Sequence, residues 1–218
     1  MLWGAVIEGA GVRAFDGDIP VEPARLPEGA AMIEIGGMDG AVPCALEGAG
    51  GVSQTAPWDV LPAAMRLQVI GAAAGRAHWD GVVLAGAGRQ LYWVHVSADE
   101  IVSFQGSLTP GLMDDLGAEG MDREALADTL SRPERLAAQL HRALLRGDKA
   151  ALSGHLAGAE LAAARPYWLG MEVVNLCGAG WDAALGLQGA MVQSEGPAAM
   201  MQRGLARLAK ALGVSVDR

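Results

Sequence analysis

Glycine turns that follow apolar segments are the residues of this sequence best suited to phosphate chemistry. The tripeptide Gly-Ala-Gly occurs four times, starting at Gly9, Gly48, Gly86 and Gly178, and three of the copies directly follow an apolar segment. Glycine permits positive φ and close approach, so backbone N–H groups of such turns can receive phosphate oxygens. We predict phosphate-binding or nucleotide-binding backbone at Gly9, Gly11, Gly86, Gly88, Gly178 and Gly180. Simple tight turns are the alternative that the sequence leaves open.

One carboxylate stands beside the first turn. Glu8 ends an apolar segment and precedes Gly9, where an acid could hold a metal–nucleotide complex, although a structural role is equally open. The four histidines fall on different predicted elements without the spacing of metal ligands, so we predict no protein-bound metal site. Cys44 and Cys177 are far apart and outside any Cys/His cluster, which favours two reduced thiols.

The last glycine turn also fits a dinucleotide-binding pattern. Gly178, Gly180 and Ala183 form G-x-G-x-x-A after an apolar segment, and Glu195 follows at a distance suited to a ribose hydroxyl. The helix between them is short and only one further helix follows, which leaves no room for a doubly wound sheet. A Rossmann-type dinucleotide binder is therefore the less favoured alternative.

Charge and hydropathy exclude several classes of partner. The chain has 218 residues, 51% hydrophobic and 19% charged, with a net charge of −9. Binding nucleic acid or anionic membranes requires clustered Lys and Arg, so neither partner is predicted. The N-terminus lacks a basic start, and the apolar run at 67–74 is too short to span a bilayer. We expect a cytoplasmic protein.

The predicted elements change in character near residue 62. Before it, residues 5–18 indicate strand, turn and strand, three prolines mark a connector at 19–29, and 30–51 holds one or two short strands. A helix begins at residue 62, and residues 80–109 indicate three strands joined by turns.

Helices dominate the rest of the chain. Ser131 and Glu134 have the spacing of a capping box ahead of inward-facing leucines at 136, 140 and 144. A helix stopped by Pro166, a strand, a short helix, a strand and a helix opened by Pro197 complete the order. A three-stranded meander followed by alternating helices and strands predicts an α/β, ribonuclease H-like fold. We predict a reduced N-terminal domain at 1–75 and a complete C-terminal domain at 76–218.

Taken together, these segments resemble the 2-dehydro-3-deoxygalactonokinase family of the actin-like ATPase superfamily. The segments that carry the resemblance keep the family's order from residue 67 to residue 212. They are LQVIGA at 67–72, VVLAGAGRQLYWV at 82–94, FQGSL at 104–108, LSGHLAGAELAAARPYW at 152–168, VNLCGAGWDAAL at 174–185 and MMQRGLARLAKAL at 200–212. The opening VIEGAGVRAFDGD resembles the family's first strand and phosphate loop.

The resemblance implies an ATP-dependent kinase that phosphorylates 2-dehydro-3-deoxy-D-galactonate in galactonate catabolism, with Mg²⁺ as cofactor. It implies two ribonuclease H-like domains with the nucleotide and the sugar acid between them. By position, it implies a catalytic role for Glu8 and substrate contacts for Arg66, Gln105 and Ser107.

Polar residues of the family's motifs are replaced here. Ala87, Gly88 and Gln90 stand where the family has Thr, His and Lys, and Gln105-Gly106-Ser107-Leu108 replaces Thr-Gly-Glu-Leu. Loss of one charge-stabilising donor costs about 10²–10³ in rate, so we expect weak or lost activity. The alternative is a non-catalytic homologue, or pseudoenzyme, that binds a sugar acid or a nucleotide. A shortened first domain would expose cleft surface, which suggests a homodimer.

Overall fold

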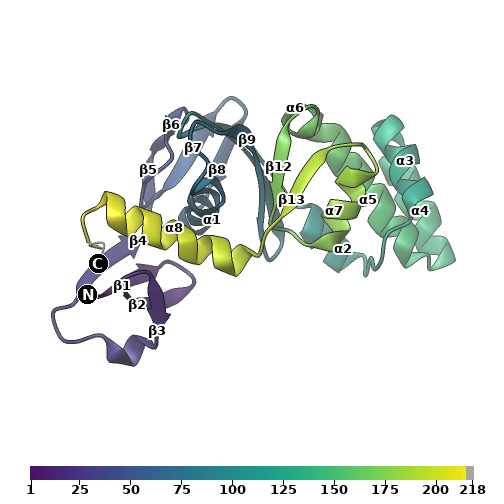
Figure 1. Ribbon diagram of the computed structural model, residues 1–218. Coiled ribbons are helices and arrows are strands. Elements are labelled where there is room, and N and C mark those ends of the chain that lie inside the picture. Colours follow the sequence, from purple (N-terminus) through teal and green to yellow (C-terminus); the bar gives the residue numbers. More distant parts are fainter. Residues whose placement is uncertain (215–218) are drawn as a thin grey trace. The chain divides into compact units, whose positions relative to one another are not determined.

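The computed structural model describes residues 1–214 and has a mixed α/β fold, as predicted (Figure 1). Contacts divide it into two compact units. Unit 1 holds residues 1–80, 94–104 and 195 to the end of the described chain, and unit 2 holds 81–93 and 105–194. The predicted domains were continuous in sequence, whereas the chain passes between these units after residues 80, 93 and 104 and again before its last helix.

The N-terminal part of unit 1 is a four-stranded sheet. Its strands are β1 (Leu2–Ile7), β2 (Gly11–Asp16), β3 (Ile19–Val21) and β4 (Ala31–Ile35), in the order β3-β2-β1-β4, and η1 (Pro23–Arg25) lies in the connection. The predicted strand–turn–strand is the hairpin β1–β2. Trp3 stacks on Phe15 with ring centroids 4.5 Å apart, and both side chains are buried.

Unit 1 also contains a second small sheet and two long helices. Strands β5 (Met38–Ala41), β7 (Gly51–Thr55) and β8 (Trp58–Leu61) form the sheet, and β6 (Cys44–Ala45) pairs with β11 (Glu100–Ser107). Helix α1 (Ala63–Ala73) packs against α8 (Pro197–Ala211) through glycines, since a Cβ on Gly204 would lie 2.0 Å from the carbonyl oxygen of Leu67. Backbones this close exclude larger residues at the crossing.

Unit 2 is built on a sheet with the strand order β13-β12-β9-β10-β11. Strands β9 (Asp80–Ala87), β10 (Gln90–Ser97) and β11 form the predicted meander, and β12 (Glu172–Asn175) lies parallel to both β9 and β13 (Met191–Ser194). Val82, Leu84 and Val173 are fully buried. Such continuous apolar runs are expected of strands covered on both faces.

The helices of unit 2 are α2 (Thr109–Asp115), α3 (Arg123–Ser131), η2 (Pro133–Arg135), α4 (Leu136–Arg146), α5 (Lys149–Ala163), α6 (Arg165–Trp168) and α7 (Ala179–Gly186). Leu126 and Leu161 from two of these helices join Trp93 and Trp168 in the hydrophobic core of the unit. No helix within residues 1–214 is long and apolar enough to cross a membrane.

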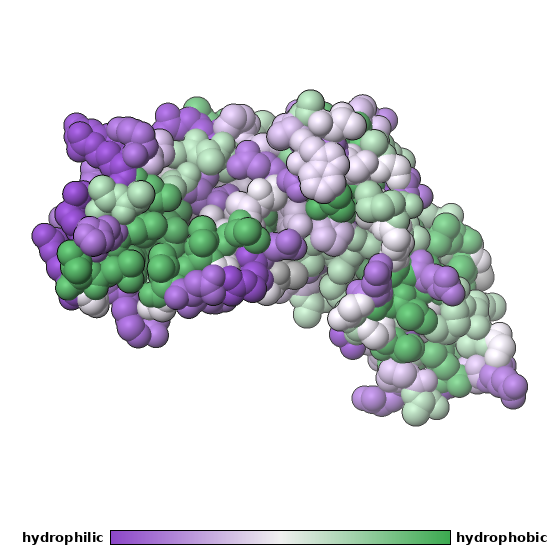
Figure 2. Space-filling view, turned by 180° about the vertical axis from the view of Figure 1, so that it is seen from behind, coloured by the Kyte–Doolittle hydropathy of each residue, from purple (hydrophilic) through white to green (hydrophobic). Residues whose placement is uncertain are grey.

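The predicted capping box at Ser131 is wrong. Ser131 is the last residue of α3, and α4 begins at Leu136 without a side-chain cap because Pro133 diverts the backbone into η2. The register of α4 also differs from the prediction, since Gln139 and Ala143 are buried whereas Leu144 is 48% exposed. Hydrophobic residues accordingly gather over the helices of unit 2 on the face seen in Figure 2.

Candidate functional site

Two glycine turns meet at one edge of the sheet in unit 2. Strands β9 and β12 are parallel neighbours, with Leu84 opposite Asn175, so both turns follow the carboxyl ends of their strands. Ligands of open α/β sheets bind at this edge. The N–H of Leu176 donates to the carbonyl of Leu84 at 2.9 Å, which continues the pairing up to the turns.

A cavity of about 210 Å³ lies between these turns. Gly86, Gly88 and Gln90 line it from the β9–β10 turn, and Cys177, Trp181 and Pro110 complete the lining. Two predicted glycines thus lie in the cavity wall, and the other two, Gly178 and Gly180, stand between its lining residues Cys177 and Trp181 in the sequence. None of the six lining residues is charged, so only uncharged polar groups of these residues are available to a ligand.

Local geometry explains why glycine occupies these positions. A Cβ on Gly86 would lie 2.9 Å from the sulfur of Cys177, and Gly88 has a φ of 56°. Gly178 has a φ of 92° and is the N-cap of α7. A side chain at Gly86 would close the space beside Cys177, and the other two backbones are conformations that L-residues rarely adopt.

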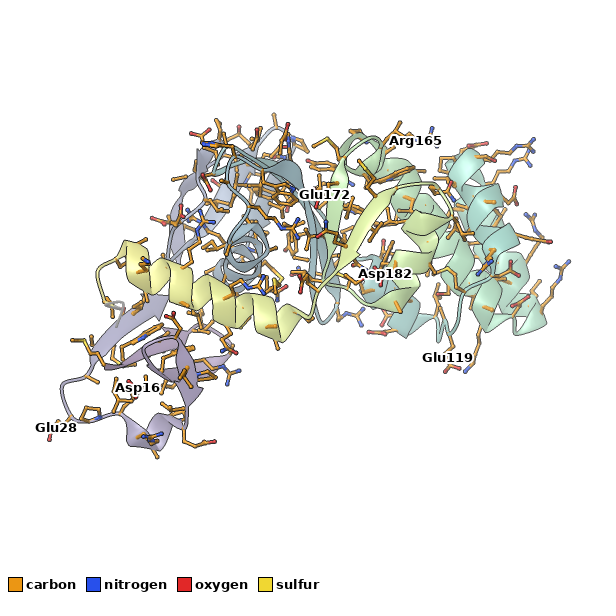
Figure 3. All side chains as sticks on the ribbon, in the orientation of Figure 1. Asp16, Glu28, Glu119, Arg165, Glu172 and Asp182 are labelled. Carbon is orange, nitrogen blue, oxygen red and sulfur yellow. The ribbon has the colours of Figure 1, made fainter. Side chains whose placement is uncertain are left out.

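Asn175 organises the turn after β12. Its side chain donates to the carbonyl of Gly178 at 2.9 Å and to Asp182 Oδ1 at 2.7 Å, and it accepts from the N–H of Cys177 at 2.8 Å. Asp182, labelled in Figure 3, lies in the first turn of α7. Asn175 therefore connects strand, turn and helix, and the sequence-based site prediction does not include it.

A buried carboxylate lies behind the cavity. Trp93 meets Trp181 edge to face, with ring centroids 6.5 Å apart, and its indole N–H donates to Glu160 Oε1 at 2.7 Å. The hydroxyl of Thr109 donates to Glu160 Oε2 at 2.5 Å. Glu160 is 4% exposed, and its two hydrogen bonds connect α5 to β10 and to α2. These contacts fix the ring of Trp181 that lines the cavity.

The thiol of Cys177 is a weak acid in this setting. Burial, followed by the nearby charge of Glu160, raises the pKa of Cys177 to about 12. The thiol also donates a hydrogen bond to the carbonyl oxygen of Leu84, with 3.5 Å between the sulfur and that oxygen. The group is therefore a neutral thiol at neutral pH and supplies no charge to the cavity.

Arg89 brings a cation next to the cavity. It lies between Gly88 and Gln90, and its guanidinium makes two hydrogen bonds to the carboxylate of Asp115, at 2.9 and 2.5 Å. These bonds lower the pKa of Asp115 and raise the pKa of Arg89. The sequence-based prediction names neither residue, although a basic residue directly after Gly88 was the available signal.

The remaining predicted residues of unit 2 lie on β11. Gln105 and Ser107 are half-buried, and the Ser107 hydroxyl donates to Thr109 Oγ1 at 3.3 Å. Ser107 is therefore linked to the buried Glu160 through Thr109, whose hydroxyl donates to that carboxylate. Their assignment as substrate-binding residues stays a prediction.

Glu8, Gly9 and Gly11 belong to unit 1, at the end of β1. The carboxylate of Glu8 accepts a hydrogen bond from the N–H of Gly37 at 3.0 Å, across the edge where β1 and β4 end. Gly9 and Gly11 have φ values of 75° and 76° in the β1–β2 turn, with open space where a Cβ would be. Their catalytic and phosphate-binding roles stay predictions.

Arg66 is buried in unit 1 and holds a loop. Its guanidinium donates to the carbonyls of Leu46, Gly50 and Ala45 at 2.7–3.0 Å and to Asp39 at 3.0 Å. A Cβ on Gly48 would lie 2.2 Å from this guanidinium, which explains the glycine there. The structure gives Arg66 a clear role in packing, and its contact with a substrate stays a prediction.

Within residues 1–214, no group of three or more His, Cys, Asp or Glu side chains could hold a metal ion. A magnesium ion bound to this protein would therefore need phosphate oxygens of a ligand and water molecules among its ligands, as Mg²⁺ usually has.

The fold matches a solved structure. It is similar, with a TM-score of 0.73 and 20% sequence identity, to a crystal structure described as that of a "putative 2-dehydro-3-deoxygalactonokinase protein from Sinorhizobium meliloti". The match covers 87% of this chain and 82% of that chain. At this identity the likeness establishes a shared fold alone. No protein-family model and no curated protein sequence matches the chain.

Proposed function

We propose that this protein is a sugar-acid kinase of the 2-dehydro-3-deoxygalactonokinase type with an actin-like ATPase fold and much reduced catalysis. The single observation that carries the proposal is the shared fold over 87% of the chain with a structure described as such a kinase. The meander β9–β10–β11 followed by β12 and β13 also has the strand order that we expect of a ribonuclease H-like core.

The cavity of unit 2 is the proposed nucleotide site. ATP would supply the transferable phosphoryl group, and backbone N–H groups at Gly86, Gly88, Gly178 and Gly180 are the proposed contacts of its phosphates. Open backbone at the carboxyl ends of parallel strands suits such contacts. Arg89 is the nearby guanidinium that could add charge if Asp115 released it.

Slow turnover follows from the lining of that cavity. Phosphoryl transfer relies on positioning and on neutralising the charge of the phosphates. The six lining residues carry no charge, and the buried Glu160 and its influence on Cys177 make the surroundings less favourable for anions. Active kinases turn over at about 1–100 per second. We expect a rate lower by about 10² or more.

The second candidate is a nucleotide-binding protein without catalysis. The observation that favours it is that glycine turns, Asn175 and the Trp93–Trp181 pair preserve a formed cavity although charged groups are missing from its lining. Such a protein would bind Mg-ATP and leave it intact.

A coupled assay with 2-dehydro-3-deoxygalactonate and Mg-ATP, together with thermal-shift titrations, tests both candidates. Slow ADP formation that depends on the sugar acid supports the kinase, and an ATP-dependent shift without turnover supports the second candidate. No shift at millimolar Mg-ATP would contradict both. A shift with NAD but not with ATP would favour a dinucleotide binder instead.

A further inference from the structure

A groove in unit 2 has an acidic wall opposite a basic wall. Helices α3 and α4 each pack on α5, and a cavity of about 360 Å³ opens among the three. Glu124 and Asp128 line it from α3, and Arg142 and Arg146 line it from α4. Within the described chain, no salt bridge within 4.0 Å joins these walls. Opposite charges thus line one cavity without direct ion pairs between them.

Two further carboxylates at the groove are already committed to helix ends. Asp122 accepts from the N–H groups of Glu124 and Ala125 at the start of α3, and Asp148 accepts from the N–H of Ala151 at the start of α5. Both are side-chain caps that hold the helices in place. They add negative charge without being free to move toward the arginines.

A chain of hydrogen bonds selects one tautomer of the neutral His155 ring at the groove. Gln139 Nε2 donates to Asp128 at 2.7 Å, which orients its amide so that Oε1 faces the hydroxyl of Thr129 at 2.8 Å. That hydroxyl has one proton, which it donates to Gln139. His155 Nδ1, also 2.8 Å from the hydroxyl, must therefore be the donor in its bond to Thr129.

The consequence is an unprotonated Nε2 when His155 is neutral. Thr129 and Gln139 are 0% and 1% exposed, so their bonds form in a low-dielectric interior where leaving them unmade is expensive. His155 itself is half-buried and lines the groove. Its Nε2 lone pair is an acceptor for an N–H or O–H group.

We infer that this groove binds a small zwitterion, with a carboxylate on Arg142 and Arg146 and an ammonium group on Glu124 and Asp128. Charge-assisted hydrogen bonds would form at both walls, which are the strong class of such bonds. His155 Nε2 would accept a further hydrogen bond from the ligand. The cavity volume is in the range of small-molecule sites.

Other ligand classes fit the groove less well. A simple anion would face four carboxylates against two guanidinium groups, which is unfavourable. A metal ion lacks ligands, because the carboxylates do not converge within the described residues. An apolar ligand would leave the charged walls unpaired.

Calorimetric titration of the purified full chain with β-alanine, 4-aminobutanoate and 6-aminohexanoate tests the inference, because these zwitterions place the same two charged groups at increasing separation. We expect at least one to bind with a Kd of about 1 mM or tighter. Butylamine and butanoate each lack one charge and should bind at least about tenfold more weakly. No heat from any zwitterion at about 10 mM, or equal binding of butanoate, would overturn the inference.

Variants locate the binding. Arg142→Gln with Arg146→Gln, and separately Glu124→Gln, change exposed side chains, so the fold should persist by circular dichroism. Each should weaken the best zwitterion by about tenfold. Arg165→Gln on α6, labelled in Figure 3, removes one positive charge outside the groove and should leave the binding unchanged. Unchanged binding in both groove variants would overturn the inference.

His155 has a readout of its own. Long-range ¹H–¹⁵N NMR should show Nδ1 protonated and Nε2 unprotonated in the neutral ring, and the zwitterion should shift the Nε2 signal. His155→Asn should weaken binding by about three- to tenfold. An Nε2–H tautomer, or an Nε2 signal unmoved by saturating zwitterion, would contradict the contact with His155.

Discussion

Arg89 and Asp115 form a two-bond ion pair in unit 2, and Arg89 directly follows Gly88, which lines the cavity of that unit. Bidentate guanidinium–carboxylate pairs are geometrically specific. Both side chains are 56% exposed, so the pair contributes little to stability. Its main effect is to engage the guanidinium of Arg89, which directly follows one of the glycines proposed to contact phosphate.

Freeing Arg89 should therefore strengthen the binding of Mg-ATP. Asp115→Asn removes the competing charge, and we expect the Kd for Mg-ATP to fall by about three- to tenfold, whereas Arg89→Gln should raise it by a similar factor. Calorimetry at fixed ionic strength measures both. An equal Kd in both variants would show that Arg89 stays away from the phosphates.

The pH dependence of this pair has a definite sign. The pKa of Asp115 is lowered by Arg89, so the pair is intact above the ordinary carboxyl pKa and is lost as pH falls through the lowered value. The gain in ATP affinity of Asp115→Asn over the natural chain should thus be present at neutral pH and shrink in acid. A gain that grew toward low pH would contradict this model.

Glu160 should be the most sensitive residue of the cavity's support. Glu160→Ala leaves the indole N–H of Trp93 and the hydroxyl of Thr109 without their partner, and we expect a loss of about 2–4 kcal/mol in the free energy of unfolding. Glu160→Gln keeps an acceptor for Trp93 and should cost about 1 kcal/mol. Urea denaturation measures both.

Glu134→Ala is the matched control for this pair of variants. Its side chain is 70% exposed and should change the unfolding free energy by no more than about 0.5 kcal/mol. Equal losses in Glu160→Ala and Glu134→Ala would mean that the buried contacts of Glu160 contribute nothing.

The local part of this structure could be predicted from the sequence. Glycine turns, alternating strands and helix boundaries such as Gly147–Asp148 and Pro197 depend on neighbouring residues, and they appear as expected. The order of the strands in unit 2 follows from these elements. The mixed α/β class was therefore predictable.

The contacts that support the candidate site could not be predicted. Trp93 and Glu160 are separated by 67 residues, and nothing local in LSGHLAGAE indicates that its glutamate is buried against an indole. The leucines of α4 mislead for a related reason. Their spacing fits an inward face, but Gln139 is the buried residue, and its amide is hydrogen-bonded to Thr129 and Asp128 of α3.

Cys177 should react slowly with thiol reagents. Because burial and Glu160 raise its pKa to about 12, the thiolate fraction at pH 8 is about 10⁻⁴. We expect labelling by a disulfide reagent to be at least about 10²-fold slower in the folded chain than in denaturant. The rate should rise steadily with pH up to about 12 for as long as the chain stays folded.

Mass spectrometry assigns the labelled site, which separates Cys177 from Cys44. Burial also raises the pKa of Cys44, with Arg66 opposing the shift, so it should be the faster of the two. Rapid modification of Cys177 at pH 8 would show that the thiol is open to solvent.

Gly180→Ala separates the requirements of the fold from those of the ligand. Gly180 lies in the first turn of α7, and a Cβ there would meet nothing within 4 Å, at a position without positive φ. Alanine in a helix is more favourable than glycine by about 0.5–1 kcal/mol, so the variant should be as stable as the natural chain or slightly more stable.

Gly186→Ala, at the other end of α7, also meets open space and serves as the matched control. If the N–H of Gly180 approaches a phosphate closely, Gly180→Ala should weaken Mg-ATP binding by about tenfold while Gly186→Ala leaves it unchanged. Equal ATP affinity in both variants would remove Gly180 from the proposed nucleotide site.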